Sequence, residues 1–215
     1  MTQKLNKTYN DLDKKYYLQN FKRYPLTFDH GKGSLIWDVQ GNEFIDMLGG
    51  IAVNSVGHSH PKVVKAIQDQ AAKLIHISNF YLSEPQVMLS KKLVELSGLD
   101  RVFIANSGAE SVEGAIKIAR KYAHSIGRGG NIISFENSFH GRTLATLAAT
   151  GQGKFHKAFK PLINTFTYVT PNDVQELEKA ISSKTAAVMI EPILGEGGLL
   201  PITREYYKAV RSLCD

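Results

Sequence analysis

Short apolar runs alternate with amphipathic helical stretches in the second half of the chain, and this alternation is the strongest constraint on its fold. The apolar runs cover residues 102–105, 132–135 and 186–190. Helical periodicity covers about residues 110–126, 173–181 and 203–213. Parallel strands need helical crossovers between them, so this pattern predicts an α/β fold with a mostly parallel sheet flanked by helices.

The first hundred residues predict smaller elements of a different kind. A polar and aromatic segment predicts a peripheral helix that ends before Pro25. Residues 34–39 and 43–47 alternate apolar and polar side chains around a turn at Gly41, which predicts a β-hairpin. Apolar stripes predict two further helices, over residues 61–74 and from residue 83 or 84 to Gly98.

Composition excludes several classes of protein. With 215 residues and 43% hydrophobic side chains, the chain can bury about 70% of its unfolded surface. The net charge of +6 is spread without a block of like charges, so we expect no nucleic-acid partner, whereas anionic small molecules fit. One cysteine, Cys214, and a polar start without a signal peptide predict a cytoplasmic protein. No uncharged apolar run approaches the roughly 18 residues of a membrane helix, so no membrane span is expected.

The end of the sequence predicts further chain. Tyr206, Val210 and Leu213 are still in helical phase when the sequence stops at Asp215. In an α/β fold this helix leads to another strand. We therefore expect the sequence to be the N-terminal portion of a longer protein.

Three loops follow the predicted strands, and ligands of open α/β sheets bind at that edge, so we expect the loops to converge. In the first, Ser107 and Glu110 fit the S-x-x-E capping box at the start of a helix. Backbone N–H groups at such a start also favour an anion. The loop is therefore both a predicted helix cap and a candidate phosphate cradle.

The second and third loops carry side chains that suit a ligand. Phe139, His140 and Arg142 could stack on a planar cofactor, hydrogen-bond it and bind a carboxylate. The alternative is a turn in which Phe139 fills the core and Arg142 is a surface charge. Residues 191–198 combine two glutamates with three glycines, which indicates either a tight backbone path near a ligand or a solvent turn.

Three other motifs give no evidence for a functional site. His58 and His60 lack a third metal ligand nearby, so we interpret them as part of a helix-entry turn and expect no metal site. Residues 150–154 lack the residues that a phosphate-binding nucleotide loop requires. Cys214 has no catalytic signature around it.

Taken in order, these motifs resemble the N-terminal half of the class III, fold type I, pyridoxal-phosphate-dependent aminotransferases. The motifs are LIWDVQG at 35–41, GGIAVN at 49–54, GHSHP at 57–61, NSGAE at 106–110, FHGR at 139–142 and EPILGEGG at 191–198. The resemblance implies a truncated fold type I chain. Residues 1–60 would form an N-terminal segment whose hairpin belongs to the small domain, and residues 61–215 the first part of the large cofactor-binding domain.

The resemblance also implies which residues hold pyridoxal 5′-phosphate. Ser107, Gly108 and Ala109 would hold the cofactor phosphate at the helix N-terminus, in agreement with the anion argument. Phe139 would stack on the pyridine ring, and His140 would support the same wall of the site.

Substrate roles follow from the same resemblance. Arg142 would pair with the α-carboxylate of the amino donor or with 2-oxoglutarate. Glu196 matches a glutamate that helps the site accept first a cationic amine and then a dicarboxylate. Tyr24 matches a residue that lines the substrate entrance.

Within the class, residues 49–54 and 139–152 are most similar to the acetylornithine aminotransferases of arginine biosynthesis. These enzymes convert N2-acetyl-L-ornithine and 2-oxoglutarate to N-acetyl-L-glutamate 5-semialdehyde and L-glutamate. Ornithine and 4-aminobutyrate aminotransferases stay as alternatives, although bacterial ornithine enzymes tend to carry an aromatic residue in place of Ile51. A homodimer with shared active sites is implied.

The catalytic residue itself is not expected in this chain. Transamination needs a Schiff-base lysine and an acidic residue that keeps the pyridine nitrogen protonated. No residue here stands in a matching context, so both are expected beyond Asp215, and the 215-residue chain alone is expected to be inactive. The alternative from another class is a complete, non-catalytic binding protein or one piece of a split enzyme.

Overall fold

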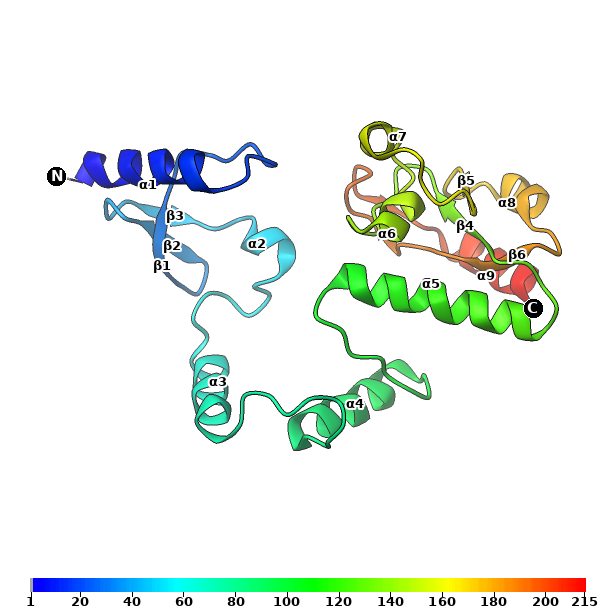
Figure 1. Cartoon of the computed structure of the whole chain (residues 1–215), viewed down its shortest axis with the longest axis horizontal. Coiled ribbons are helices and arrows are strands. Elements are labelled where there is room, and N and C mark those ends of the chain that lie inside the picture. The colour runs from blue at the N-terminus through cyan, green and yellow to red at the C-terminus, as the bar shows by residue number, and fades with distance from the viewer. Residues whose placement is uncertain (1) are drawn as a thin grey trace. The chain divides into compact units, whose positions relative to one another are not determined.

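The computed structural model describes residues 2–215 and divides the chain into two compact units. The first ends at Val87 and the second runs from Met88 to Asp215. The first contains a small antiparallel sheet, and the second contains the parallel sheet that the sequence predicts (Figure 1).

The first unit begins with helix α1 (Thr2–Tyr16) and a three-stranded sheet in the order β1-β2-β3. The strands are β1 (Phe28–Lys32), β2 (Leu35–Asp38) and β3 (Glu43–Ile45). The predicted peripheral helix is confirmed but ends well before Pro25. The predicted hairpin is the β2–β3 pair, and its turn is fixed by the Asp38 carboxylate, which accepts the N–H groups of Gln40 and Asn42, both at 2.9 Å.

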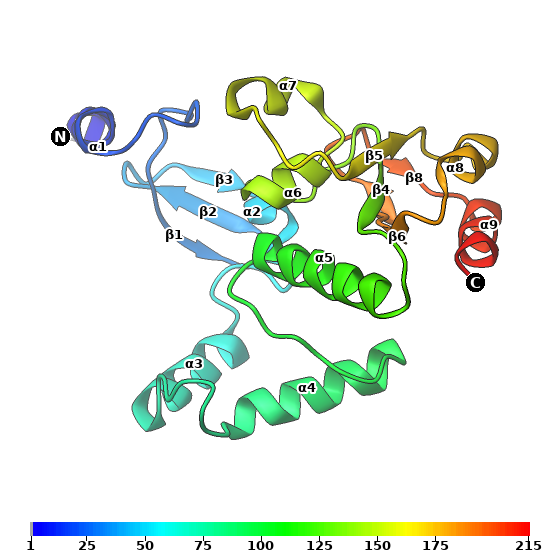
Figure 2. The same ribbon diagram turned by 45° about the vertical axis from the view of Figure 1, so that its right-hand side comes forward.

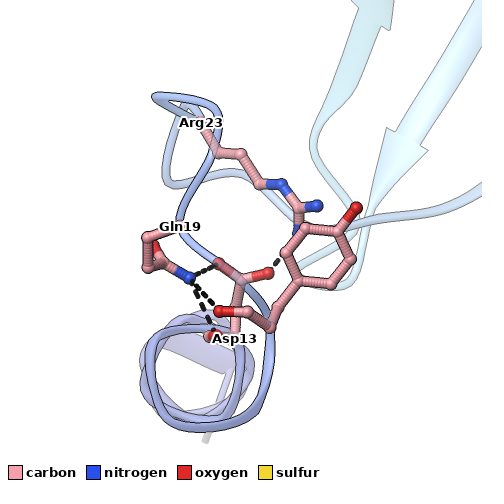
Figure 3. A network of polar contacts seen from close by, with 4 residues as sticks. Asp13, Gln19 and Arg23 are labelled. Atoms are coloured by element: carbon pink, nitrogen blue, oxygen red, sulfur yellow. Dashed lines mark hydrogen bonds and ion pairs between the residues drawn. The ribbon is translucent and has the colours of Figure 1, made fainter. Parts of the chain in front are cut away.

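The segment after α1 is fixed by a polar network around Asp13 (Figure 3). The Gln19 amide donates to the Asp13 backbone oxygen at 3.0 Å and to its carboxylate at 3.3 Å. Arg23 forms an ion pair with the same carboxylate and lies over the Tyr17 ring, with 3.8 Å from Cζ to the centroid. The network holds the backbone that leads to Tyr24.

His58 lies directly before the turn at Ser59 that leads into α3 (Pro61–Lys73), which agrees with the predicted helix-entry turn. Its Nε2 lies 2.6 Å from the Asp46 carboxylate, and its backbone pairs with Gly33. The same Asp46 side chain accepts the N–H groups of Leu48 and Gly49. These bonds lower the pKa of Asp46, the bond to His58 most strongly.

Three helices follow the small sheet, and the last of them extends from the first unit into the second. They are α2 (Gly49–Ala52), α3 (Pro61–Lys73) and α4 (Glu84–Ser97). The last two confirm the helices predicted from apolar stripes. Pro61 opens α3 because its fixed φ suits the first helical position. Gly98, at φ +71°, ends α4.

The second unit is built on a parallel sheet in the order β5-β4-β6. Its strands are β4 (Asn131–Phe135), β5 (Phe166–Val169) and β6 (Thr185–Val188). Its longer helices are α5 (Gly108–Ser125), α6 (Leu144–Ala149), α8 (Val174–Ala180) and α9 (Arg204–Cys214). Smaller elements are α7 (Gly153–His156), the 3₁₀ turn η1 (Lys157–Phe159), and the antiparallel pair β7 (Ile193–Leu194) and β8 (Leu200–Pro201). This arrangement confirms the predicted α/β fold.

Alternate side chains of β4 enter two different cores. Ile132 packs with Ile116 of α5 on one face of the sheet. Ile133 and Phe135 pack with Tyr206 of α9 on the other face. Figure 2 shows α5 and α6 on one side of the strands and α8 and α9 on the other. Burying each large apolar side chain of this kind stabilises the fold by about 1.5–3 kcal/mol, so β4 is the centre of the second unit.

One predicted strand is wrong. Residues 102–105 are not a strand in the structure, and Phe103 and Ile104 are 62% and 40% exposed. A strand forms only against a neighbour, and among residues 2–215 the parallel sheet consists of β5, β4 and β6 without this segment.

Among residues 2–215, no helix combines the length and the apolar character that crossing a bilayer requires.

Candidate functional site

The first loop is a helix cap, as predicted. Ser107 is the N-cap of α5, and its Oγ accepts the N–H of Glu110 at 3.2 Å. The Glu110 carboxylate reaches back and accepts the N–H of Asn106 at 2.6 Å. This reciprocal pair holds the start of α5 rigidly at the edge of the sheet.

The start of α5 also has room and donors for an anion. Within the part of the chain that the structure describes, the N–H groups of Gly108 and Ala109 have no acceptor. A Cβ built on Gly108 would meet no atom within 4 Å, so the space in front of the backbone is open. Free donors at the positive end of an eighteen-residue helix fit a phosphate group.

The second and third loops touch directly. The N–H of Phe139 donates to the Glu191 carboxylate at 2.8 Å, across a sequence separation of 52 residues. A Cβ at Gly197 would lie 2.8 Å from the backbone oxygen of Asn137, so the two backbones approach closely at this glycine.

The first and second loops are also in contact. The Cβ of Ala109 lies 3.0 Å from the position that a Cβ on Gly141 would take. The Thr143 hydroxyl donates to the Glu113 carboxylate of α5. The three loops therefore lie together near the carboxyl ends of β4 and β6. The parallel sheet accounts for the second and third loops, as expected, whereas the first loop follows residues 102–105, which form no strand.

His140 is anchored in the interior beneath this edge. It is 8% exposed, and its Nε2 lies 3.0 Å from Ser134 Oγ of β4. Its backbone N–H donates to Thr150 Oγ1 at 2.9 Å. Burial lowers the pKa of His140 to about 4, so the imidazole is neutral at neutral pH.

The residues after α6 close the second loop. Gly151 forms a parallel bridge with Glu136, and its N–H donates to Ser138 Oγ at 3.0 Å. The Gln152 amide donates to the backbone oxygen of Ser138 at 3.0 Å. Residues 150–154 lack the residues of a nucleotide loop, and in the structure Gly151 and Gln152 hold the loop that carries Phe139.

Arg142 is exposed and lies near two aromatic rings. Its Cζ is 4.4 Å from the Phe155 ring centroid and 5.4 Å from that of Phe139. Phe139 is half-buried and belongs to neither core cluster of the described chain. The structure therefore brings the predicted aromatic and guanidinium groups together at the sheet edge.

Two glutamates of the third loop are close enough to interact. Burial raises the pKa of Glu191, and the nearby charge of Glu196 adds to this increase. Backbone N–H groups of Phe139 and Gly195 act in the opposite direction. Glu196 was a predicted site residue, whereas Glu191 was given no role. Its position directly after an apolar run was the signal that could have identified it.

Tyr24 lies in the first unit, after the Asp13 network, and 87% of its surface is exposed. The residues that the structure brings together, from Ser107 to Glu196, all belong to the second unit. Across residues 2–215, the His, Cys, Asp and Glu side chains form no group of three or more that could hold a metal ion.

Comparison with known proteins gives consistent results. The family model for class-III aminotransferases matches residues 16–215. An acetylornithine aminotransferase of Methanocaldococcus jannaschii is 57% identical over 95% of this chain and 52% of its own length. One from Clostridium acetobutylicum is 47% identical over 95% of this chain and 53% of its own length. The chain thus spans about half the length of the curated relatives it matches.

Solved structures agree with these relatives. An ornithine aminotransferase of Toxoplasma gondii, described with partial occupancy of PLP at its active site, has a TM-score of 0.91 and 32% identity. The similarity covers 97% of this chain and 50% of that one. An N-acetylornithine aminotransferase of Stenotrophomonas maltophilia has a TM-score of 0.78 and 40% identity, over 95% of this chain and 50% of that one.

Proposed function

Because this chain belongs to the class-III aminotransferase family, we propose that the whole protein transfers an amino group with pyridoxal 5′-phosphate as its cofactor. The observation that carries the proposal is the convergence of three loops at one sheet edge. There, free N–H groups at the start of α5 accompany an aromatic ring and a guanidinium. The family and the fold type predicted from the sequence motifs are confirmed.

The amino donor that we propose is N2-acetyl-L-ornithine, with 2-oxoglutarate as acceptor and N-acetyl-L-glutamate 5-semialdehyde and L-glutamate as products. Support comes from curated relatives with this name at 57% and 47% identity. L-Ornithine is the second candidate, because a structure named ornithine aminotransferase has a TM-score of 0.91 to this chain. 4-Aminobutyrate is the third candidate, on the resemblance of the sequence motifs alone.

The cofactor would be held by residues of the first two loops. Ser107, Gly108 and Ala109 would bind its phosphate through the start of α5. Phe139 would stack on its ring, and neutral His140 would support that ring from the interior. When bound, the cofactor supplies an electron sink that makes the hydrogen on the amine-bearing carbon acidic.

Substrates would be oriented by the exposed charges of the same edge. The Arg142 fork suits the carboxylate of an amino acid and one carboxylate of 2-oxoglutarate. Glu196 would favour a cationic amine group, and Tyr24 would line the entrance. The lysine that moves the proton and the acid that pairs with the ring nitrogen would lie in the remaining length of the protein.

Assembly and location are also part of the proposal. We expect a homodimer with shared active sites that acts in the cytoplasm, and an inactive chain when residues 1–215 stand alone. The rival interpretations are a non-catalytic binding protein or one piece of a split enzyme.

The test is an assay of the full-length protein with three donors, acetylornithine, ornithine and 4-aminobutyrate, each with 2-oxoglutarate. Glutamate formation with at least tenfold higher kcat/KM for acetylornithine supports the proposal. A preference for ornithine selects the second candidate. If no donor yields glutamate while residues 1–215 alone unfold in one cooperative transition, the binding-protein interpretation replaces it.

A further inference from the structure

We propose that Glu191 is a positioning residue, whose carboxylate holds the backbone amide of Phe139 and thereby sets the place of the ring that stacks on the cofactor. The effect of this contact on cofactor binding rests on the proposed function. The contact itself belongs to this chain and can be tested without cofactor.

The geometry places Glu191 well for this task. It follows the end of β6, and Phe139 follows the end of β4, its direct neighbour in the parallel sheet. The Phe139 N–H donates to Glu191 Oε2 at 2.8 Å. Because the two loops leave adjacent strands at the same edge, a short side-chain bond can connect their backbones.

Phe139 needs such a connection because its side chain is poorly anchored. The next residue, His140, is held in the interior by bonds to Ser134 and Thr150. The Phe139 ring itself is half-buried and outside both core clusters of the described residues. Its orientation therefore depends strongly on its backbone, and Glu191 holds that backbone from the side of the third loop.

The third loop is rigid enough to act as the anchor. Gly197 lies against the Asn137 backbone with no room for a Cβ. Leu194 is fully buried and pairs with Leu200 in the β7–β8 ladder. Glu191 thus extends from a loop that is fixed on one side by the core and on the other by the second loop.

Side-chain length and acceptor chemistry distinguish the variants. Glu191→Gln keeps an oxygen acceptor at the same reach but removes the charge. Glu191→Ala leaves the Phe139 N–H without its acceptor. Glu191→Asp keeps the charge and draws the carboxylate back by one methylene group. A positioning role predicts that Gln retains the function and that Ala and Asp lose it.

The first experiment measures hydrogen exchange by mass spectrometry on the full-length apoprotein, in the peptide that covers residues 136–143. Exchange at the Phe139 amide is expected to be at least tenfold faster in Glu191→Ala than in the wild type, and within twofold of it in Glu191→Gln. Glu178→Ala, at an exposed glutamate of α8, is the matched control and should leave this peptide unchanged. If Glu191→Ala does not fold, Glu191→Asp takes its place with the same expectation.

The second experiment measures the dissociation of pyridoxal phosphate from the holoenzyme after dilution. It should be at least fivefold faster in Glu191→Ala and within twofold of the wild type in Glu191→Gln. If pyridoxal phosphate dissociates as fast from Glu191→Gln as from Glu191→Ala, the charge of Glu191 acts directly and the positioning role is overturned. Unchanged hydrogen exchange at the Phe139 amide in Glu191→Ala also overturns the positioning role. If the wild-type protein binds no pyridoxal phosphate, the proposed function is contradicted instead. The exchange experiment then still tests whether Glu191 holds the Phe139 amide.

Discussion

The guanidinium of Arg142 lies over the ring of Phe155, with 4.4 Å between Cζ and the ring centroid. The Phe139 ring centroid is 5.4 Å from the same atom. Such cation–π contacts contribute about 0.5–1 kcal/mol at exposed sites. The two rings therefore restrain an exposed cation at the site edge while leaving its N–H groups available to a carboxylate.

Arg142→Ala in the full-length enzyme is expected to raise the KM of both the amino donor and 2-oxoglutarate about tenfold or more. Hydrogen bonds to charged groups contribute about 1.5–3 kcal/mol each. Phe155→Leu should raise both KM values only a few-fold, because it removes the ring beneath the cation. Steady-state kinetics measures both, with Arg204→Ala, at an exposed arginine of α9, as control. Unchanged KM values would remove Arg142 from the carboxylate role.

Ser107→Ala and Asp173→Ala form a matched pair. Each removes an N-cap, since Asp173 Oδ1 accepts the Glu176 N–H of α8 at 2.9 Å as Ser107 does for α5. Both should lower the free energy of unfolding by about 1 kcal/mol. Only Ser107→Ala should also weaken the binding of pyridoxal phosphate, measured by equilibrium dialysis. Equal cofactor affinity in the two variants would reduce Ser107 to a helix cap.

His140 makes stability depend on pH. Its pKa is lowered to about 4 by burial, against about 6.5 in the unfolded chain. Between these values the unfolded state binds more protons, so stability is complete above pH 6.5 and falls as the pH decreases toward 4. The slope from this residue is at most about 1.4 kcal/mol per pH unit.

Urea unfolding between pH 7 and pH 5 measures this slope. His140→Gln should unfold with a weaker pH dependence than the wild type. His124→Gln, at an exposed histidine of α5, should keep the wild-type dependence. A His140→Gln protein with the full wild-type slope would show that other groups cause the acid destabilisation.

Gly151→Ala and Gly153→Ala test the closure of the second loop. A Cβ at Gly151 would overlap the backbone oxygen of Phe135, whereas one at Gly153 would meet no atom within 4 Å. We expect Gly151→Ala to destabilise the protein by about 2 kcal/mol or more, as overpacking does, and to weaken cofactor binding. Gly153→Ala should change neither. Thermal unfolding of both variants is the measurement, and equal midpoints would mean that the loop adapts at no cost.

The periodic elements of the second unit could be predicted because their signals are local. Helices α5, α8 and α9 have apolar stripes and start at Ser107, Asp173 and Thr203, whose side chains each cap the helix. Helix α6 gave no stripe because five of its six residues are buried. Residues 102–105 have the composition of a strand. A strand also requires a neighbouring strand to pair with, and composition alone does not show whether one is present.

In the site, too, features with a local signal could be predicted and contacts between distant residues could not. The meeting of the second and third loops could be predicted, because the carboxyl ends of neighbouring parallel strands lie at one edge of a sheet. The bond from Phe139 to Glu191 could not, because it joins residues 52 positions apart through one atom of a carboxylate. Nor could the sequence show that His140 turns inward to Ser134, since a loop histidine suits either side.

The bridge between Glu136 and Gly151 fixes both ends of residues 137–150 at the end of β4. Inside this interval His140 is pinned to the interior, and five residues of α6 are buried. Only residues 142–144 are exposed in succession. A gain or loss of residues at most positions of this interval would therefore displace Phe139. Relatives that differ in length here should place the difference at residues 142–144.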